Sequence, residues 1–141
     1  TEVHEGKGHW MELADRKAIP WMEKFSRNPL PEKVVWHQDD VTHSRFYWLA
    51  TPEPRAGDEI VARRQQQTIT LTAPEGRPLS VRLNDSMVAL DQPVTVVRNE
   101  KTVFTGLLPR TIGTISKTLK ELGDPALVFC AEIELPAGTP P

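Results

Sequence analysis

Short β-type runs separated by regular turns fill the middle of the chain, and this pattern restricts the fold more than any other feature of the sequence. The runs are rich in β-branched and aromatic residues, which favour strands, and several alternate apolar with polar positions. Turn signals recur at a spacing of roughly eight to twelve residues, which is typical of a small β-sandwich or partial barrel. We therefore expect strands at 33–38, 45–50, 59–63, 68–72, 79–83, 94–97 and 102–105.

Two of the turns indicate how neighbouring strands connect. The string Arg98-Asn99-Glu100-Lys101 lies between two strand-like runs and predicts a β-hairpin. The polar segment 39–44 separates the first two expected strands. We interpret these two strands as a first hairpin with that segment as its tip.

A late helix is predicted at 111–122. Its apolar residues recur at helical spacing, at Ile112, Ile115, Leu119 and Leu122. Gly123 follows directly and is a common stop for a helix. We expect this helix to pack on the sheet and to lead into a last strand at 127–135.

The residues before 32 have a helical pattern instead. Their apolar positions follow steps of three and four, the period of one helical face, at Trp10, Leu13, Ala14, Ala18, Trp21, Met22 and Phe25. Pro20 interrupts this run, so we interpret it as two short helical pieces around a proline kink. Pro20 could also sit in the first turn of the second piece. Asn28-Pro29-Leu30-Pro31 ends the zone, because a residue before proline avoids the helical region.

These patterns predict an α+β fold, with a short helical N-terminal segment followed by a mainly antiparallel β-sandwich-like module with one late helix. We divide the chain into a helical part at 1–31, a β-rich module at 32–135 and a disordered tail at 136–141. Hydrophobic residues make up 38% of the 141 residues, too many for a disordered protein.

Charge and composition argue against several partners. The formal net charge of −2 provides no basic field for nucleic acid, and it argues equally against polybasic membrane targeting. No apolar run approaches the roughly 18 residues that a membrane-spanning helix needs. Cys130 is the single cysteine, so no intramolecular disulfide can form, and its apolar surroundings predict a buried, inert thiol. A single cysteine is compatible with a reducing or an oxidising cellular compartment.

His9 is the candidate catalytic residue. It stands in Gly8-His9-Trp10-Met11, after a strand-like start and a glycine-rich turn and before a helical run. Such a turn exposes an imidazole at the carboxyl end of a strand, where it could act as a general base toward a hydroxyl nucleophile. The alternative is a loop or partly buried histidine with no reaction to perform.

At these residues the segment resembles the C-terminal end of the α/β-hydrolase fold. More narrowly, Gly8-His9-Trp10-Met11 and Arg45-Phe46-Tyr47-Trp48-Leu49 are similar to the tail of bacterial esterase- or peptidase-like hydrolases in which a β-rich segment follows the last helix. The resemblance implies that His9 is the base of a catalytic triad. It also implies that the nucleophile and the acid lie upstream, because the family order is nucleophile, acid, histidine.

The resemblance further implies a fragment of a serine hydrolase that is inert alone. No serine in the chain has the flanking glycines of a G-x-S-x-G elbow. The chain begins with Thr1 and runs directly into strand-like residues, which we interpret as the middle of an element. We expect the upstream hydrolase domain of the same protein as partner, with some self-association through 1–5 or an aromatic face. The alternative is a non-catalytic sandwich that binds a saccharide, a peptide or another subunit.

We predict no metal and no cofactor. His37, Asp39, Asp40 and His43 cluster in one expected turn, but their spacing matches no metal-site pattern, and a solvated hairpin tip explains them. Asp85 and Asp91 could bind a hard cation or simply form Asx turns. The remaining candidates are aromatic, and they form either packing contacts or an exposed binding face: Trp10, Trp21, Trp36, Phe46, Tyr47 and Trp48.

Overall fold

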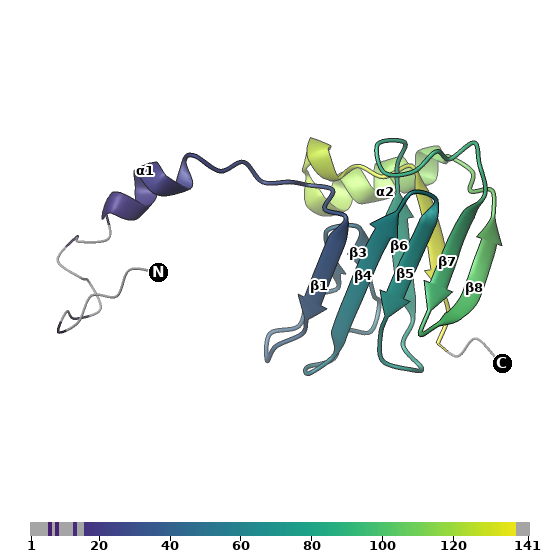
Figure 1. The fold of residues 1–141 in the computed structure, drawn as a ribbon, viewed down its shortest axis with the longest axis horizontal. Helices are drawn as coiled ribbons and strands as arrows, with labels where there is room; N and C mark the ends of the chain where they lie inside the picture. Colours follow the sequence, from purple (N-terminus) through teal and green to yellow (C-terminus); the bar gives the residue numbers. More distant parts are fainter. Residues whose placement is uncertain (1–5, 7, 9–12, 14–15, 138–141) are drawn as a thin grey trace.

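Two β-sheets pack face to face in the computed structural model, which describes residues 6, 8, 13 and 16–137 (Figure 1). The five-stranded sheet has the order β1 (Lys33–His37), β4 (Glu59–Gln65), β5 (Thr68–Thr72), β7 (Val94–Arg98) and β8 (Lys101–Gly106). The four-stranded sheet has the order β2 (Arg45–Phe46), β3 (Leu49–Ala50), β6 (Leu79–Leu83) and β9 (Ala131–Leu135). The helices are α1 (Ala18–Met22), which stands apart from the sandwich, and α2 (Ile112–Leu122), which lies against the smaller sheet.

The predicted α+β fold with a mainly antiparallel β-sandwich and one late helix is confirmed. Every neighbouring pair of strands is antiparallel except β5 and β7, which run parallel. The inner faces of the two sheets form one apolar core, since alternate residues of each strand point inward. Its fully buried side chains include Trp48, Leu49, Ile69, Leu71, Val81, Val94, Val96 and Phe129.

The segment 45–50 is a tight hairpin and not the single strand that its composition predicts. Phe46 pairs with Leu49, and Tyr47 and Trp48 make the turn between β2 and β3. Tyr47 has a φ of 53°, a backbone conformation that its propensity gives no reason to expect. Burial explains it, because Trp48 is fully enclosed and its Nε1 donates to the Pro31 carbonyl at 2.9 Å.

The expected first hairpin is wrong as well. β1 pairs with β4, so the segment 39–44 carries the chain from one sheet to the other. Gln38 is buried and closes this connection. Its side chain accepts from the His43 backbone N–H at 2.9 Å and donates to the His43 carbonyl at 2.7 Å.

The second hairpin, between β7 and β8, is confirmed. Asn99 and Glu100 have φ values of 48° and 67°, the pair of positive angles that a two-residue hairpin turn requires. The Asn99 side chain also binds both the N–H and the carbonyl of Ala73, at the end of β5. The turn is therefore tied to the neighbouring strand of the same sheet.

The late helix has the predicted ends, but the last strand starts later than expected. Thr111 caps the N-terminus of α2, and Gly123 ends it with a left-handed backbone. Residues 126–130 are not strand, because Asp124 caps the 3₁₀ turn Pro125–Leu127. β9 begins only at Ala131.

α2 turns its polar side to the sandwich. Thr118 is its fully buried residue, and the hydroxyl donates to the Thr114 carbonyl and accepts from the Phe129 N–H at 3.1 Å. Three of the four apolar stripe residues remain exposed, Ile112 at 85%, Ile115 at 38% and Leu119 at 45%, and only Leu122 packs against the core. The helical period is thus correct, but it does not identify the face that packs.

Replacing Thr118 with valine should expose the dependence of the last strand on this hydroxyl. Thr118→Val keeps the shape but removes the acceptor of the Phe129 N–H, so we expect a loss of about 1–3 kcal/mol of unfolding free energy. Hydrogen exchange of the Phe129 amide should accelerate in Thr118→Val and stay slow in Thr118→Ser, which retains the hydroxyl. Equal protection in both variants would show that the bond contributes nothing.

Candidate functional site

A cavity of about 600 Å³ lies on the outer face of the smaller sheet, beside α2. Its floor follows one row of paired residues that crosses all four strands: Arg45, Ala50, Ser80 and Glu134. The two inner members of this row are small, whereas the two outer members are long and charged. The hollow therefore forms where the strand pairing places alanine beside serine.

Helix α2 and a set of prolines complete the walls. Lys117 and Glu121 line the cavity from the helix. The apolar part of the cavity lining consists of Pro52, Pro78, Leu79, Leu135 and Pro136. Its size is in the range of about 300–1,000 Å³ that small-molecule sites occupy.

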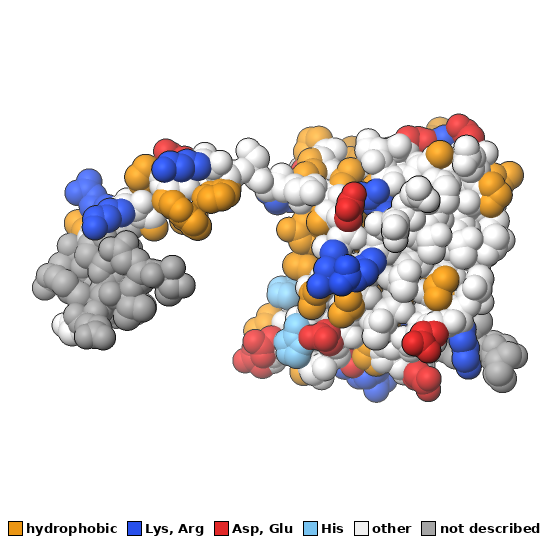
Figure 2. All heavy atoms as spheres, viewed as in Figure 1, with side chains coloured by type: hydrophobic (Ala, Val, Ile, Leu, Met, Phe, Trp, Pro, Cys, Tyr) orange, Lys and Arg blue, Asp and Glu red, His pale blue; other side chains and the backbone are white. Residues whose placement is uncertain are grey.

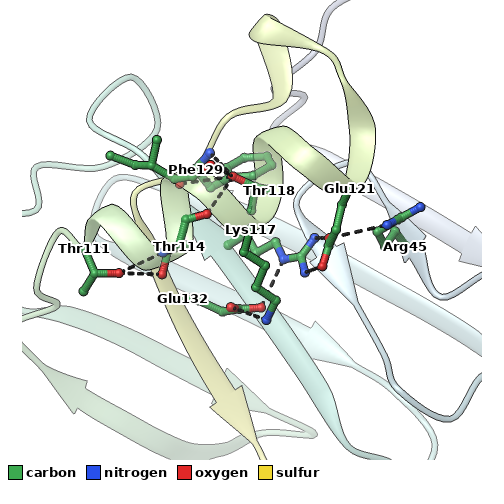
Figure 3. Close-up of polar contacts among 10 residues, drawn as sticks. Arg45, Thr111, Thr114, Lys117, Thr118, Glu121, Phe129 and Glu132 are labelled. Atoms are coloured by element: carbon green, nitrogen blue, oxygen red, sulfur yellow. Dashed lines mark hydrogen bonds and ion pairs between the residues drawn. The ribbon is translucent and has the colours of Figure 1, made fainter.

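A network of alternating charges joins the helix to the sheet at this cavity (Figure 3). Arg82 is the centre, with a side chain only 3% exposed. Its Nη1 and Nη2 donate to the Glu121 carboxylate at 2.7 and 3.3 Å, and its Nε donates to Glu132 at 3.1 Å. Lys117 binds the other oxygen of Glu132 at 2.8 Å, and Arg45 lies 3.5 Å from Glu121.

The network keeps Glu132 charged. Burial by itself raises the pKa of this carboxyl, but the hydrogen bonds from Lys117 and Arg82 and their positive charges outweigh that effect. The pKa of Glu132 is therefore below its ordinary value. A carboxylate that stays ionised at neutral pH carries no proton to donate, so Glu132 is not suited to act as a general acid.

The sequence analysis did not identify the residues of this network as candidates. Alternation along β6 places Ser80 and Arg82 on one face, and alternation along β9 does the same for Glu132 and Glu134. Only the pairing of β6 with β9, about fifty residues later, brings the two sets together. The signal in the sequence was that charged residues, Arg82, Glu132 and Glu134, occupy strand positions.

The predicted catalytic residue, His9, lies outside the described residues. The same holds for the strand expected at 1–5, for Trp10 and for 138–141 of the expected tail. The structure therefore gives no neighbours for His9, and its catalytic role stays a prediction.

The histidine and aspartate cluster at 37–43 does not converge. His37 faces Glu59 across the sheet at 3.8 Å, and both side chains are exposed. Within the residues that the structure describes, no group of three histidine, cysteine or acidic side chains is placed to hold a metal ion.

Asp85 and Asp91 both bind Arg110, at 2.5 and 2.8 Å. Hydrogen bonding to this guanidinium lowers the pKa of both carboxyls. The two aspartates thus belong to an exposed ion-pair network, and the Asx turn in this loop is formed by Asn84.

The predicted burial of Cys130 is only partly correct, because the residue is half-buried. Burial raises the pKa of its thiol, which keeps the thiol protonated.

The aromatic residues divide between packing and exposure. Trp36 and Trp48 belong to the core, and Phe46 stacks on Trp36 with ring centroids 6.0 Å apart. The rings of Trp21 and Phe25 pack against each other with centroids 4.7 Å apart, but both side chains are exposed and neither belongs to the sandwich core.

Comparisons with known proteins supply no relative. No family model matches the chain, and neither the curated proteins nor the solved structures include one with significant similarity. In the described part of the chain, no helix is both long enough and apolar enough to cross a bilayer.

Removing the central cation should destabilise the module strongly. Arg82→Met removes the buried cation that Glu121 and Glu132 share and leaves them only Arg45 and Lys117, so we expect a loss of up to about 3–5 kcal/mol in the free energy of unfolding. The control Arg110→Met removes an arginine that also binds two carboxylates, but in an exposed network. Denaturant unfolding should show a much smaller loss for the control, and similar losses would contradict a special role for Arg82.

The lowered pKa of Glu132 predicts a pH dependence. A carboxyl whose folded pKa is depressed adds stability above its unfolded pKa and loses it as the pH falls through the folded value. Unfolding free energy should therefore decline below the ordinary value of 4.5, and Glu132→Gln should make this decline shallower. Comparing the two proteins isolates Glu132 from the other carboxylates, and parallel pH profiles would refute the assignment.

Proposed function

We propose that this chain is the C-terminal part of a serine hydrolase that acts on an ester or a peptide. In this proposal His9 is the base of the triad, and the nucleophile and acid belong to the upstream part of the same protein. The β-sandwich is an accessory module that packs on the catalytic domain and shapes substrate access. The chain alone is then inert.

The apolar face of α1 is the observation that carries this proposal. No residue of the helix is buried, and four large apolar side chains of this segment are each about 60% exposed: Ile19, Trp21, Met22 and Phe25. Figure 2 shows these side chains gathered on the helix, away from the sandwich. A helix of five residues is not stable in water by itself. The segment therefore needs a second body to pack against, as the last helix of a hydrolase domain would.

The segment that connects α1 to the sandwich is fixed to the sandwich at its C-terminal end, residues 27–31. Arg27 binds Asp124, just beyond the end of α2, at 2.6 Å. Leu30 packs against the core, and the Pro31 carbonyl accepts from Trp48. A domain attached through α1 would thus lie near the end of α2.

Two surfaces of the sandwich differ in their suitability for such a contact. The outer face of the five-stranded sheet, turned to the viewer in Figure 2, shows few apolar side chains over β4, β5 and β7. The exposed stripe of α2 is apolar, and it runs from Ile112 toward the C-terminal end of the helix, just beyond which Arg27 anchors the linker at Asp124. This stripe supports docking on the α2 side of the module.

A non-catalytic binding module is the second candidate. The cavity on the outer face of the smaller sheet favours it, because its charged groups are fixed by the Arg82 network before any ligand arrives. The two functions are compatible, since an accessory module can itself bind a ligand.

The reading frame upstream of Thr1 provides the first test. We expect it to continue into a G-x-S-x-G elbow, with an Asp or Glu between that elbow and His9. In the protein that this frame encodes, His9→Ala should reduce ester hydrolysis at least about 1,000-fold. His37→Ala, which changes an exposed histidine of the module, should leave it unchanged. A start codon or a signal-peptide cleavage site directly before Thr1 would overturn the proposal.

A further inference from the structure

We propose that the cavity on the outer face of the smaller sheet binds a short free peptide, with its carboxylate at Arg45 and its ammonium group at Glu134. The inference does not depend on the hydrolase proposal, because every group that it uses belongs to the module. It rests on which polar groups of the cavity have unused hydrogen-bonding capacity.

The carboxylates of the network are already occupied. Both oxygens of Glu121 accept from Arg82, and one also faces Arg45. The two oxygens of Glu132 accept from Arg82 and Lys117. Because these cations already balance the charge of both carboxylates, the two groups attract a cationic ligand less strongly than an unpaired carboxylate does.

One cation at the cavity is underused. Arg45 has five N–H donors, and its ion pair with Glu121 is long, at 3.5 Å. Its side chain is 36% exposed and lies at the edge of the cavity. A guanidinium with free paired donors binds a carboxylate in a bidentate manner, which is the strongest such interaction.

Glu134 stands at the opposite end of the same row. Its side chain is exposed, and within the described part of the chain it has no hydrogen bond or ion pair. It therefore provides an acceptor for an ammonium group. Ser80 lies between the two ends, and Lys117 has further N–H groups on the helix side for a peptide carbonyl.

The spacing of the two charges suits a peptide of two or three residues. Arg45 and Glu134 are three strand spacings apart, about 14 Å between their Cα atoms. An extended dipeptide or tripeptide spans about 7–10 Å, and a hydrogen bond of about 3 Å at each terminus extends this to about 13–16 Å. This length suits charged side chains that stand roughly perpendicular to the sheet at the two ends of the row. The small side chains of Ala50 and Ser80 leave room for its backbone.

The remaining lining favours a peptide over a saccharide. The apolar end of the cavity, with Pro52, Pro78 and Pro136, can accept an apolar side chain. None of the described residues that line the cavity is aromatic, so no ring is available to stack on a sugar. Opposite charges at the two ends match the two termini of a free peptide.

Titration of the chain with the dipeptide Gly-Leu, followed by amide NMR shifts, tests this assignment. We expect saturable shifts at Ala50 and Ser80 at concentrations up to about 10 mM. N-acetyl-Gly-Leu and Gly-Leu amide, which each lack one terminal charge, should bind at least about 10-fold more weakly.

Matched variants assign each terminus. Arg45→Gln should weaken Gly-Leu and remove the difference between Gly-Leu and its amide. Glu134→Gln should do the same for the acetylated peptide, whereas Arg63→Gln, on the five-stranded sheet, should bind Gly-Leu like the parent chain. The NMR spectrum of each variant reports whether it folds.

Three results would overturn the inference. These are the absence of saturable shifts at the cavity, equal binding of all three peptides, and binding that neither cavity variant changes. None of them bears on the hydrolase proposal, which is tested by the upstream reading frame and His9. The two ideas therefore succeed or fail separately.

Discussion

The antiparallel pairing of β6 with β9 is the constraint on which the smaller sheet and its cavity depend. It places Val81 beside Ile133 on the inner face, where both join the core. On the outer face it places Arg82 beside Glu132. A shift of this register by one residue would exchange the two faces and bury the charges in the core.

The orientation of α2 follows from that outer face. Because the sheet presents a buried arginine beside a glutamate, the helix turns Glu121 toward Arg82 and Lys117 toward Glu132. Thr118 then reaches the Phe129 backbone, and most of the apolar stripe, from Ile112 to Leu119, is left outside. Buried ion pairs add little net stability, since desolvation offsets most of their attraction, but breaking one is costly. We infer that the network determines where the helix lies more than how stable the module is.

The two proposals concern different surfaces of the molecule. The apolar residues of α1 and α2 support docking of the module against a second body. The cavity beside α2 has fixed charges and small floor residues, which suit a polar ligand. A module attached to a peptide- or ester-hydrolysing domain, and carrying its own peptide site, is consistent with both.

Local chemistry in the sequence determined most of the elements. Strands β4 to β8 were predicted from alternation and turn residues, and the hairpin at Asn99 from its polar string. Thr111 and Gly123 bound α2 as capping rules require. These features depend on residues close together in the chain, so the sequence by itself is sufficient to predict them.

Tertiary structure decided the rest. The hairpin at Tyr47 contradicts β propensity because burial of Trp48 outweighs it. The pairing of β1 with β4, the outward stripe of α2 and the Arg82 network all join residues that are distant in sequence. A period shows that a helix or strand has two faces, but the partner that arrives from elsewhere in the chain selects the buried one. The physical reason is that burial is a property of the assembled layers, whereas periodicity belongs to one element alone.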